Sequence, residues 1–101
     1  MENKILAMAG LARRAGKAVS GEFAVEKSVK TGKAALVLLA ADASANTKKK
    51  FLNMCDWYHV PVFECADKAA LGKSQGQEIR SSIAVEDAGM AASMVLKLEK
   101  H

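Results

Sequence analysis

The residues best suited to bind an anion lie in one short turn, Lys17-Ala18-Val19-Ser20-Gly21-Glu22. Gly21 stands where a helix is expected to begin, and a glycine there lets the backbone approach a ligand closely. The free N–H groups of a first helical turn attract phosphate, and Lys27 follows on the same helix. The turn therefore predicts a phosphate site. The alternative is an ordinary helix start with a solvated lysine.

A second segment, Ala69-Ala70-Leu71-Gly72-Lys73-Ser74, joins small apolar residues to a cation and a hydroxyl. RNA-binding proteins often pack extruded bases on apolar or aromatic surfaces. The segment is therefore a candidate loop for contact with exposed nucleotides. The alternative is a short helix that packs on the core.

Three residues have the chemistry of soft metal ligands. Cys55 and His59 lie four residues apart, and Cys65 follows. A fourth ligand is missing from this pattern, and Cys55 falls on an apolar helical stripe. Two cysteines are too few for a disulfide framework, and reduced cysteine commonly lies in a core. We therefore expect no metal, no cofactor and no disulfide.

Three acids, Asp42, Glu64 and Glu86, come near the ends of expected strands, where paired acids can transfer protons. Such acids more often cap helices or lie in solvent. The sequence has no GxSxG elbow, no phosphate-binding P-loop and no GxGxxG dinucleotide motif. We therefore expect a protein without catalytic activity. A small-molecule enzyme that uses the three acids is an alternative.

The elements that must position these residues alternate between helical and strand periodicity. Helices are predicted over 3–14 and 22–31, from Ser44 or Asn46 onward, within 67–76, and after Asp87. Strands are predicted over 17–20, 34–41, 60–64 and 81–85. This order predicts one α/β domain over residues 1–101, with a mostly parallel or mixed four-stranded sheet between layers of helices.

Two patterns indicate the core. The segment 34–41 lacks polar alternation, which predicts a strand that is buried on both faces. On the third helix, one stripe is expected to face the core and Lys48 to Lys50 to face solvent. The stripe consists of Thr47, Phe51, Met54, Cys55 and Tyr58.

The positive charge is concentrated in the first half of the chain. Residues 1–50 contain ten Lys/Arg and four acids, a net +6, whereas residues 51–101 contain five and seven, a net −2; together they give +4. This asymmetry favours a basic face that meets a polyanion, although a solvated lysine-rich surface gives the same numbers. No apolar run approaches bilayer length, and the mixed charges at the start are untypical of a signal peptide. We therefore expect a cytoplasmic protein without membrane association.

In their order and spacing, these segments resemble the L-seven-Ae/L-thirty-e ribosomal-protein superfamily, the kink-turn RNA binders, and more narrowly its small bacterial YlxQ-type members. The resemblance runs from residue 5 to about residue 98. The matching stretches are Gly16–Gly21, Lys27, Gly32–Ala40, Asp42-Ala43, Val60–Val62, Leu71-Gly72 with Gly76, Ile83–Val85, Asp87 and Gly89.

The resemblance implies a three-layer α/β/α sandwich with a four-stranded mixed sheet. It implies binding of structured RNA, with kink-turn-like elements of rRNA as the expected target and ribosomal or ribosome-assembly proteins as further candidate partners. RNA would meet the first strand–helix junction and the loop before the last strand. The residues implied are Lys17, Ser20, Gly21, Glu22, Phe23, Lys27, Lys33, Ala70, Leu71, Gly72, Lys73 and Ser74.

One position departs from the family pattern. Many members have Asn-Glu or Lys-Gln two and three residues after the glycine, and these side chains read the guanines of tandem sheared pairs. Here Phe23 and Ala24 stand there, and neither can make polar contacts with base edges. Two residues are available to replace these base contacts. Glu22 would do so from a shifted turn, and Phe23 would do so by stacking on a base. The departure also supports an alternative, a module that uses the same loops on a protein partner.

Overall fold

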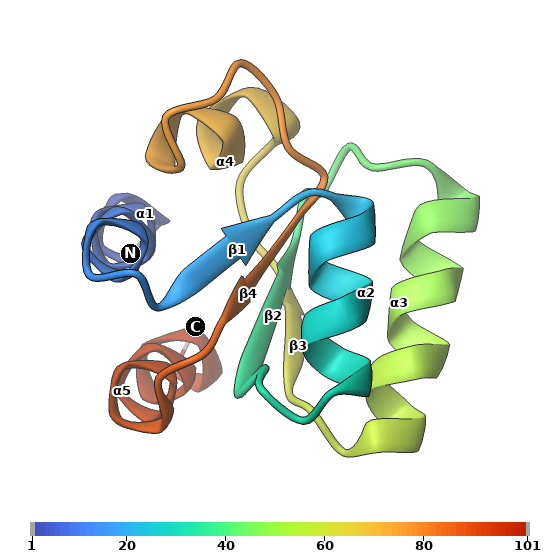
Figure 1. Ribbon diagram of the computed structural model, residues 1–101. Coiled ribbons are helices and arrows are strands. Elements are labelled where there is room, and N and C mark those ends of the chain that lie inside the picture. Colours follow the sequence, from blue (N-terminus) through green and yellow to red (C-terminus); the bar gives the residue numbers. More distant parts are fainter. Residues whose placement is uncertain (1, 101) are drawn as a thin grey trace.

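The computed structural model describes residues 2–100, in which five helices alternate with four strands (Figure 1). The helices are α1 (Glu2–Arg14), α2 (Glu22–Lys30), α3 (Ala45–Tyr58), α4 (Lys68–Ser74) and α5 (Ala88–Glu99). The strands are β1 (Ala18–Ser20), β2 (Leu36–Leu39), β3 (Val62–Glu64) and β4 (Ser82–Val85). The predicted order of elements is confirmed, and most bounds agree within about two residues.

The four strands form one mixed sheet in the order β1-β4-β2-β3. Strand β4 runs antiparallel to both β1 and β2, whereas β2 and β3 are parallel. The central strands β2 and β4 are buried along their whole length. Pro61, which has no N–H to donate, precedes the edge strand β3.

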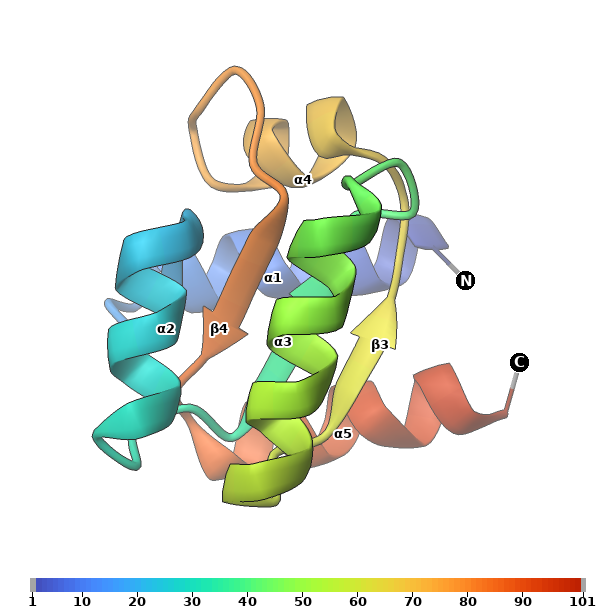
Figure 2. The same cartoon turned by 90° about the vertical axis from the view of Figure 1, so that its right-hand side faces the viewer.

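Helices cover both faces of this sheet, so the fold is a three-layer α/β/α sandwich. In Figure 2, α2 and α3 lie in front of the strands, and α1 and α5 lie behind them. The side chains of β2 alternate accordingly. Leu36 and Leu38 join the core under α1, α4 and α5, whereas Val37 and Leu39 join the core under α2 and α3. A strand with both faces covered has no position for a polar residue, which explains its uniform sequence.

Helix α3 begins at an N-cap in which Ser44 Oγ accepts a hydrogen bond from the backbone N–H of Thr47 (3.1 Å). Phe51 and Cys55 of its predicted stripe are buried, and Met54 is partly buried. Tyr58 is 41 % exposed, so its assignment to the core-facing stripe is wrong. The helix ends at Tyr58, and His59 turns the chain away in a left-handed conformation (φ 59°).

The two cysteines lie in different cores. Cys55 packs under α2 and α3, whereas Cys65 packs on the opposite side of the sheet. Burial raises the pKa of the Cys55 thiol to about 11. Burial, and then the charge of Glu2, also raise the pKa of Cys65. Both thiols therefore remain protonated near neutral pH and resemble small apolar side chains. None of the helices within residues 2–100 is long and apolar enough to span a membrane.

Phe51 is the largest fully buried side chain in residues 2–100 and should dominate the core under α2 and α3. We predict that Phe51→Ala lowers the free energy of unfolding by about 3–5 kcal/mol, because it leaves a cavity beneath the helix. Trp57→Ala is the matched control, since Trp57 lies on the same helix and is 77 % exposed. It should change stability by less than about 0.5 kcal/mol. Urea denaturation of both variants checks this, and equal losses would contradict the described face of α3.

Candidate nucleic-acid interface

The junction between β1 and α2 depends on Gly21. Ser20 ends the strand, Glu22 begins the helix, and Gly21 between them has φ +96°, a conformation that other residues rarely adopt. Its backbone N–H donates a hydrogen bond to the carbonyl of Ser82 at the start of β4 (3.1 Å). The junction is therefore held against the point at which the loop of residues 75–81 enters the sheet (Figure 1).

Arg80 ties that loop to the junction. Its Nε donates to Ser20 Oγ (3.0 Å), and its Nη1 donates to the carbonyl of Ile79 (3.0 Å). The side chain lies against Gly21, where an added Cβ would be 3.6 Å from Arg80 Nε. Ile79 itself is 57 % exposed. The structure thus places a cation and an apolar side chain beside the start of α2, where the resemblance implied that two segments would meet.

The segment 69–74 is not a loop. It belongs to α4, whose N-cap is Asp67. The Asp67 Oδ1 accepts a hydrogen bond from the backbone N–H of Ala70 (2.8 Å). Leu71 has no exposed surface and lies in the core under α1, α4 and α5. The expectation that Leu71 packs on exposed nucleotides is therefore wrong, because the helix turns its side chain inward. Ser74 Oγ donates to the carbonyl of Leu71 (2.7 Å), so the helix also engages this hydroxyl.

Gly72 sets the path of the loop that follows. A Cβ at this position would lie 2.6 Å from Ile79 Cα and 2.7 Å from the carbonyl carbon of Glu78. Only a glycine lets residues 78 and 79 fold back so closely over α4. Gly72 therefore acts by positioning Ile79 and Arg80, and it is itself buried.

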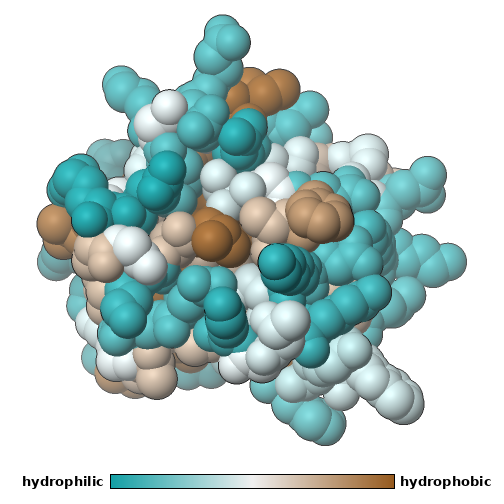
Figure 3. Space-filling view, in the orientation of Figure 1, coloured by the Kyte–Doolittle hydropathy of each residue, from teal (hydrophilic) through white to brown (hydrophobic). Residues whose placement is uncertain are grey.

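A groove of about 330 Å³ runs along the side of α2 that faces β1. It is lined by Val19, Phe23, Ala24, Lys27, Ser28, Thr31, Lys33 and Glu86. Phe23 is 82 % exposed, so this residue is not part of the core. Figure 3 shows hydrophobic surface over β1 and the first turn of α2, surrounded by hydrophilic side chains, and a further hydrophobic area over the loop between α4 and β4.

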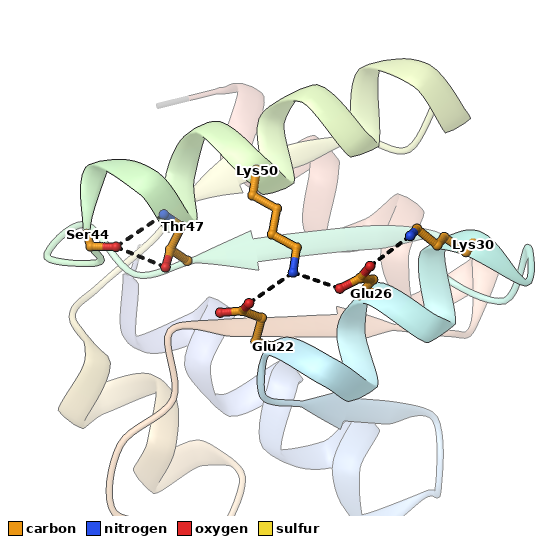
Figure 4. A network of polar contacts seen from close by, with 6 residues as sticks. All are labelled: Glu22, Glu26, Lys30, Ser44, Thr47 and Lys50. Carbon is orange, nitrogen blue, oxygen red and sulfur yellow. Dashed lines mark hydrogen bonds and ion pairs between the residues drawn. The ribbon is translucent and has the colours of Figure 1, made fainter.

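Glu22 and Glu26 belong to an ionic network with α3 (Figure 4). Lys50 Nζ lies 2.9 Å from Glu22 Oε2 and 2.7 Å from Glu26 Oε1, and Lys30 Nζ lies 2.7 Å from Glu26 Oε2. Hydrogen bonds from Lys30 and then Lys50 lower the pKa of Glu26 to about 2. Hydrogen bonds to Glu26 and then Glu22 raise the pKa of Lys50. Glu22 is thus engaged on the α3 side of α2, away from the groove, and does not replace the missing base-reading side chains.

The comparison with protein families agrees with this architecture. A model described as "Ribosomal protein L7Ae/L30e/S12e/Gadd45 family" matches residues 3–95. The chain belongs to this family. A relative from Bacillus subtilis (strain 168) named "RNA-binding protein YlxQ" is 46 % identical over 90 residues, which are 89 % of this chain and 90 % of the relative. A protein of the same name from Enterococcus faecium is 38 % identical over 87 % of this chain and 84 % of the relative.

Two solved structures share the fold of this L7Ae/L30e-family chain. A Bacillus halodurans structure, described as a protein with unknown function, superimposes with a TM-score of 0.90 at 38 % identity, covering 95 % of this chain and 97 % of the other. The "Giardia lamblia 15.5kD RNA binding protein" superimposes with a TM-score of 0.83 at 25 % identity, covering 94 % and 84 %.

The RNA-binding residues that the resemblance implied lie in several different places on the structure. Phe23, Lys27 and Lys33 line one groove. Ser20 and Gly21 lie beside Arg80. Lys17 is exposed, and its carbonyl accepts from the backbone N–H of Glu86 (2.7 Å) near one end of that groove. Ala70 is partly buried on α4. Lys73 is exposed and lines a second concavity of about 510 Å³, between the ends of α1 and α4, with Arg13 and Arg14.

Sequence reasoning missed Ile79 and Arg80. Arg80 carried one usable signal, since it is an isolated cation just before the last predicted strand in the acidic half of the chain. Val19 was named only as part of the turn, and Glu86 only as a candidate catalytic acid; their place in the groove depends on which strands are neighbours.

The three acids near strand ends do not form one site. Asp42 follows β2 and Glu64 is the last residue of the parallel strand β3, whereas Glu86 follows the antiparallel β4 and lies at the opposite end of the strands. Each also has its own partner within residues 2–100. Asp42 accepts from the backbone N–H of Lys68 (2.9 Å), Glu64 lies 3.5 Å from Lys48, and Glu86 accepts from Ser28 Oγ (2.6 Å). The groove along α2 is lined by Glu86 but by neither Asp42 nor Glu64, so it is not the shared pocket that the enzyme alternative requires.

The position of Gly72 gives a prediction about the loop. Gly72→Ala should lower the free energy of unfolding by about 1–3 kcal/mol, because the added methyl overlaps backbone that cannot move independently. Gly89→Ala, on the exposed side of α5, is the control, and it should leave stability unchanged or slightly higher. Thermal melting and the NMR shifts of Ile79 and Arg80 check this. Unchanged shifts in the Gly72→Ala protein would show that the loop does not depend on Gly72.

The ionic network gives a prediction about pH. A carboxyl whose pKa is lowered in the folded state stabilises the fold above its unfolded value near 4.5, and this contribution is lost as the pH falls toward 2. Lys50→Met should therefore raise the pKa of Glu26 and reduce the loss of stability between pH 4.5 and 2. Lys49→Met removes a neighbouring exposed charge and is the control. NMR titration of Glu26 is the measurement, and identical titration curves in both variants would contradict the network.

Proposed function

We propose that this protein binds structured RNA without catalysing a reaction, as a cytoplasmic ribosome-associated protein whose expected target is a kink-turn-like element of rRNA. The observation that carries the proposal is the joining of the β1–α2 junction to the loop 75–81 through Arg80 and Gly21. This assembly offers backbone donors, cations and exposed apolar side chains on one surface. Membership of the family, and the names of the relatives and of the Giardia protein, support it.

The start of α2 supplies the anion contact. The first intrahelical bond runs from the N–H of Val25 to the carbonyl of Gly21, and Gly21 has no side chain to cap the helix. The N–H groups of residues 22–24 therefore lack intrahelical acceptors, and the helix dipole favours negative charge there. Lys27, exposed on the next turn, adds a mobile positive charge. A phosphate of the RNA backbone fits this combination.

The loop supplies a different kind of contact. Ile79 presents a half-exposed aliphatic side chain on which a base or sugar can pack, the part that was expected of Leu71. Arg80 is fixed by Ser20 through Nε, and its remaining guanidinium N–H groups can donate to phosphate or base edges. Lys33, Lys73, Arg13 and Arg14 surround these elements and extend the positive surface.

One specific observation keeps a protein partner as a second candidate. Phe23 and Ile79 are both exposed, at 82 % and 57 %, and an aromatic with an aliphatic residue is also typical of a protein-binding surface. Salt separates the two candidates. Binding to phosphates weakens log-linearly with salt, whereas an apolar contact does not.

The test compares two substitutions in one interface. Lys27→Ala should weaken binding and reduce the salt slope of log K by roughly 0.7 to 0.9, since one phosphate contact is lost. Ile79→Ser should weaken binding by about 1–2 kcal/mol while leaving the salt slope nearly unchanged, because an apolar contact releases no counterion. Lys97→Ala on α5, behind the sheet, is the control for a general loss of charge.

The measurement is binding to a kink-turn RNA stem with tandem sheared G·A pairs, and to the same stem with full Watson–Crick pairing, at several salt concentrations. Preference for the kink-turn stem supports the rRNA target. Equal affinity for both stems would remove kink-turn specificity and leave general RNA binding. If neither substitution differs from Lys97→Ala, the junction and loop are not the RNA site. If the wild-type protein binds neither stem, the protein-partner candidate replaces RNA binding.

A further inference from the structure

We propose that the groove along α2 holds one unpaired nucleotide of the bound RNA, with its base stacked on Phe23 and its ribose and phosphate toward Lys27, Lys33 and Glu86. This inference rests on the proposed function and specifies the class of RNA element that the site accepts. It concerns the side of α2 that faces β1, which adjoins the end of the helix proposed to bind backbone phosphate and shares Lys27 with it.

The shape is that of a shallow trough along one helix. Residues 23, 24, 27, 28 and 31 follow the helical repeat and share one face of α2, and Val19 of β1 forms the opposite side. Eight residues of helix span about 12 Å, which is long enough for a base and its sugar-phosphate. The volume of about 330 Å³ lies at the small end of the range for ligand pockets. The trough suits a single nucleotide and is too small for a paired helix.

Phe23 has the placement of a ligand-contacting residue. The residue is 82 % exposed on the first turn of α2, and it belongs to neither core. An aromatic ring in this position offers a flat face to an extruded base, and such stacking tolerates any of the four bases. Ala24 beside it is small, so the trough remains open next to the ring. The two residues that cannot read base edges thus form a stacking surface together.

The charges orient the nucleotide. Lys27 and Lys33 lie successively farther from Phe23 along the trough, so a phosphate is attracted away from the ring. Glu86 lies at the same end as Lys33, since it follows β4 where that strand meets the beginning of β2. Its Oε2 accepts from Oγ of the buried Ser28 (2.6 Å), which fixes the carboxylate. A fixed acceptor in the same groove as two lysines suits a ribose 2′-hydroxyl, the group that distinguishes RNA from DNA.

The experiment uses the chain's single tryptophan. Trp57 lies on α3, outside the groove, so Trp57→Phe with Phe23→Trp places the only indole in the trough. The kink-turn stem should quench the emission of this protein when a base stacks on the indole. The same stem should leave the emission of the wild-type protein, with Trp57 on α3, nearly unchanged. Phe23 lies outside both cores, so these variants should melt at the wild-type temperature.

A coupling measurement identifies the nucleotide. Each unpaired nucleotide of the stem is replaced in turn by an abasic one, and affinity is measured for the wild-type protein, Phe23→Ala and the control Trp57→Ala. Phe23→Ala should lose about 5- to 150-fold in affinity, the range for one base on an aromatic ring. One abasic position should cause a similar loss with the wild type and no further loss with Phe23→Ala. A 2′-deoxy substitution at that nucleotide should also weaken wild-type binding.

The outcomes separate the two proposals. RNA binding by the wild type without quenching, and without any abasic position coupled to Phe23, overturns the groove inference and leaves the proposed function standing. Full coupling with no effect of the 2′-deoxy nucleotide overturns the part assigned to Glu86. If the wild-type protein binds neither stem, the proposed function fails and the groove inference fails with it.

Discussion

The antiparallel pairing of β1 with β4 is the constraint on which the rest of this surface depends. In this register Ser20 lies opposite Ile83. The last residue of β1 and the first residues of β4 are therefore neighbours at the same end of the strands. The chain leaves the sheet there into α2 and enters it there from the loop 75–81. Segments some 60 residues apart in sequence are thereby fixed side by side, and the bonds of Gly21 and Arg80 only complete what the pairing imposes.

The pairing is stable because the sheet is buried on both faces. Side chains of β2 alternate between two cores, and each core is closed by its own helices. The charged and exposed residues of the interface are therefore excluded from the interior and gather on the ends and flanks of the sandwich. In a domain of 101 residues this division matters, because small domains have little apolar surface to spare for a binding site. The proposed interface accordingly consists of loop backbone, a helix end and two exposed apolar side chains.

The sequence predicted the elements and the layers because they depend on local periodicity. The N-caps at Ser44 and Asp87 and the uniform segment 34–41 were sufficient signals. Helix α4 was harder, since seven residues span only two turns and the small residues around Leu71 do not show a clear apolar face. Gly72 was misleading for a physical reason. A glycine in such a segment suggests a loop, whereas here it lies within a helix and makes room for the backbone of the loop that crosses it.

Other parts of the site could not be predicted, because they depend on partners far along the chain. The ion pair between Glu22 and Lys50 joins α2 to α3 through residues that are 28 positions apart in the sequence. Local sequence does not indicate which side of α2 the carboxylate faces. The exposure of Phe23 is a similar case, since an aromatic near a helix start is equally compatible with burial.

In the proposed interface, Phe23 and Ala24 stand where many family members have polar residues, which changes the kind of contact and leaves its place unaltered. Backbone N–H groups at the start of α2, and the loop held by Arg80, do not depend on the side chains at these two positions. Phosphate contacts position an RNA, whereas contacts with bases determine which RNA is preferred. This chain keeps the groups for phosphate contacts and has an aromatic ring in place of hydrogen-bonding side chains. It should therefore bind RNA in the same orientation as its relatives and accept more kinds of base at this position. Selectivity would then come from the shape of the RNA, in particular from an unpaired nucleotide that can reach the groove.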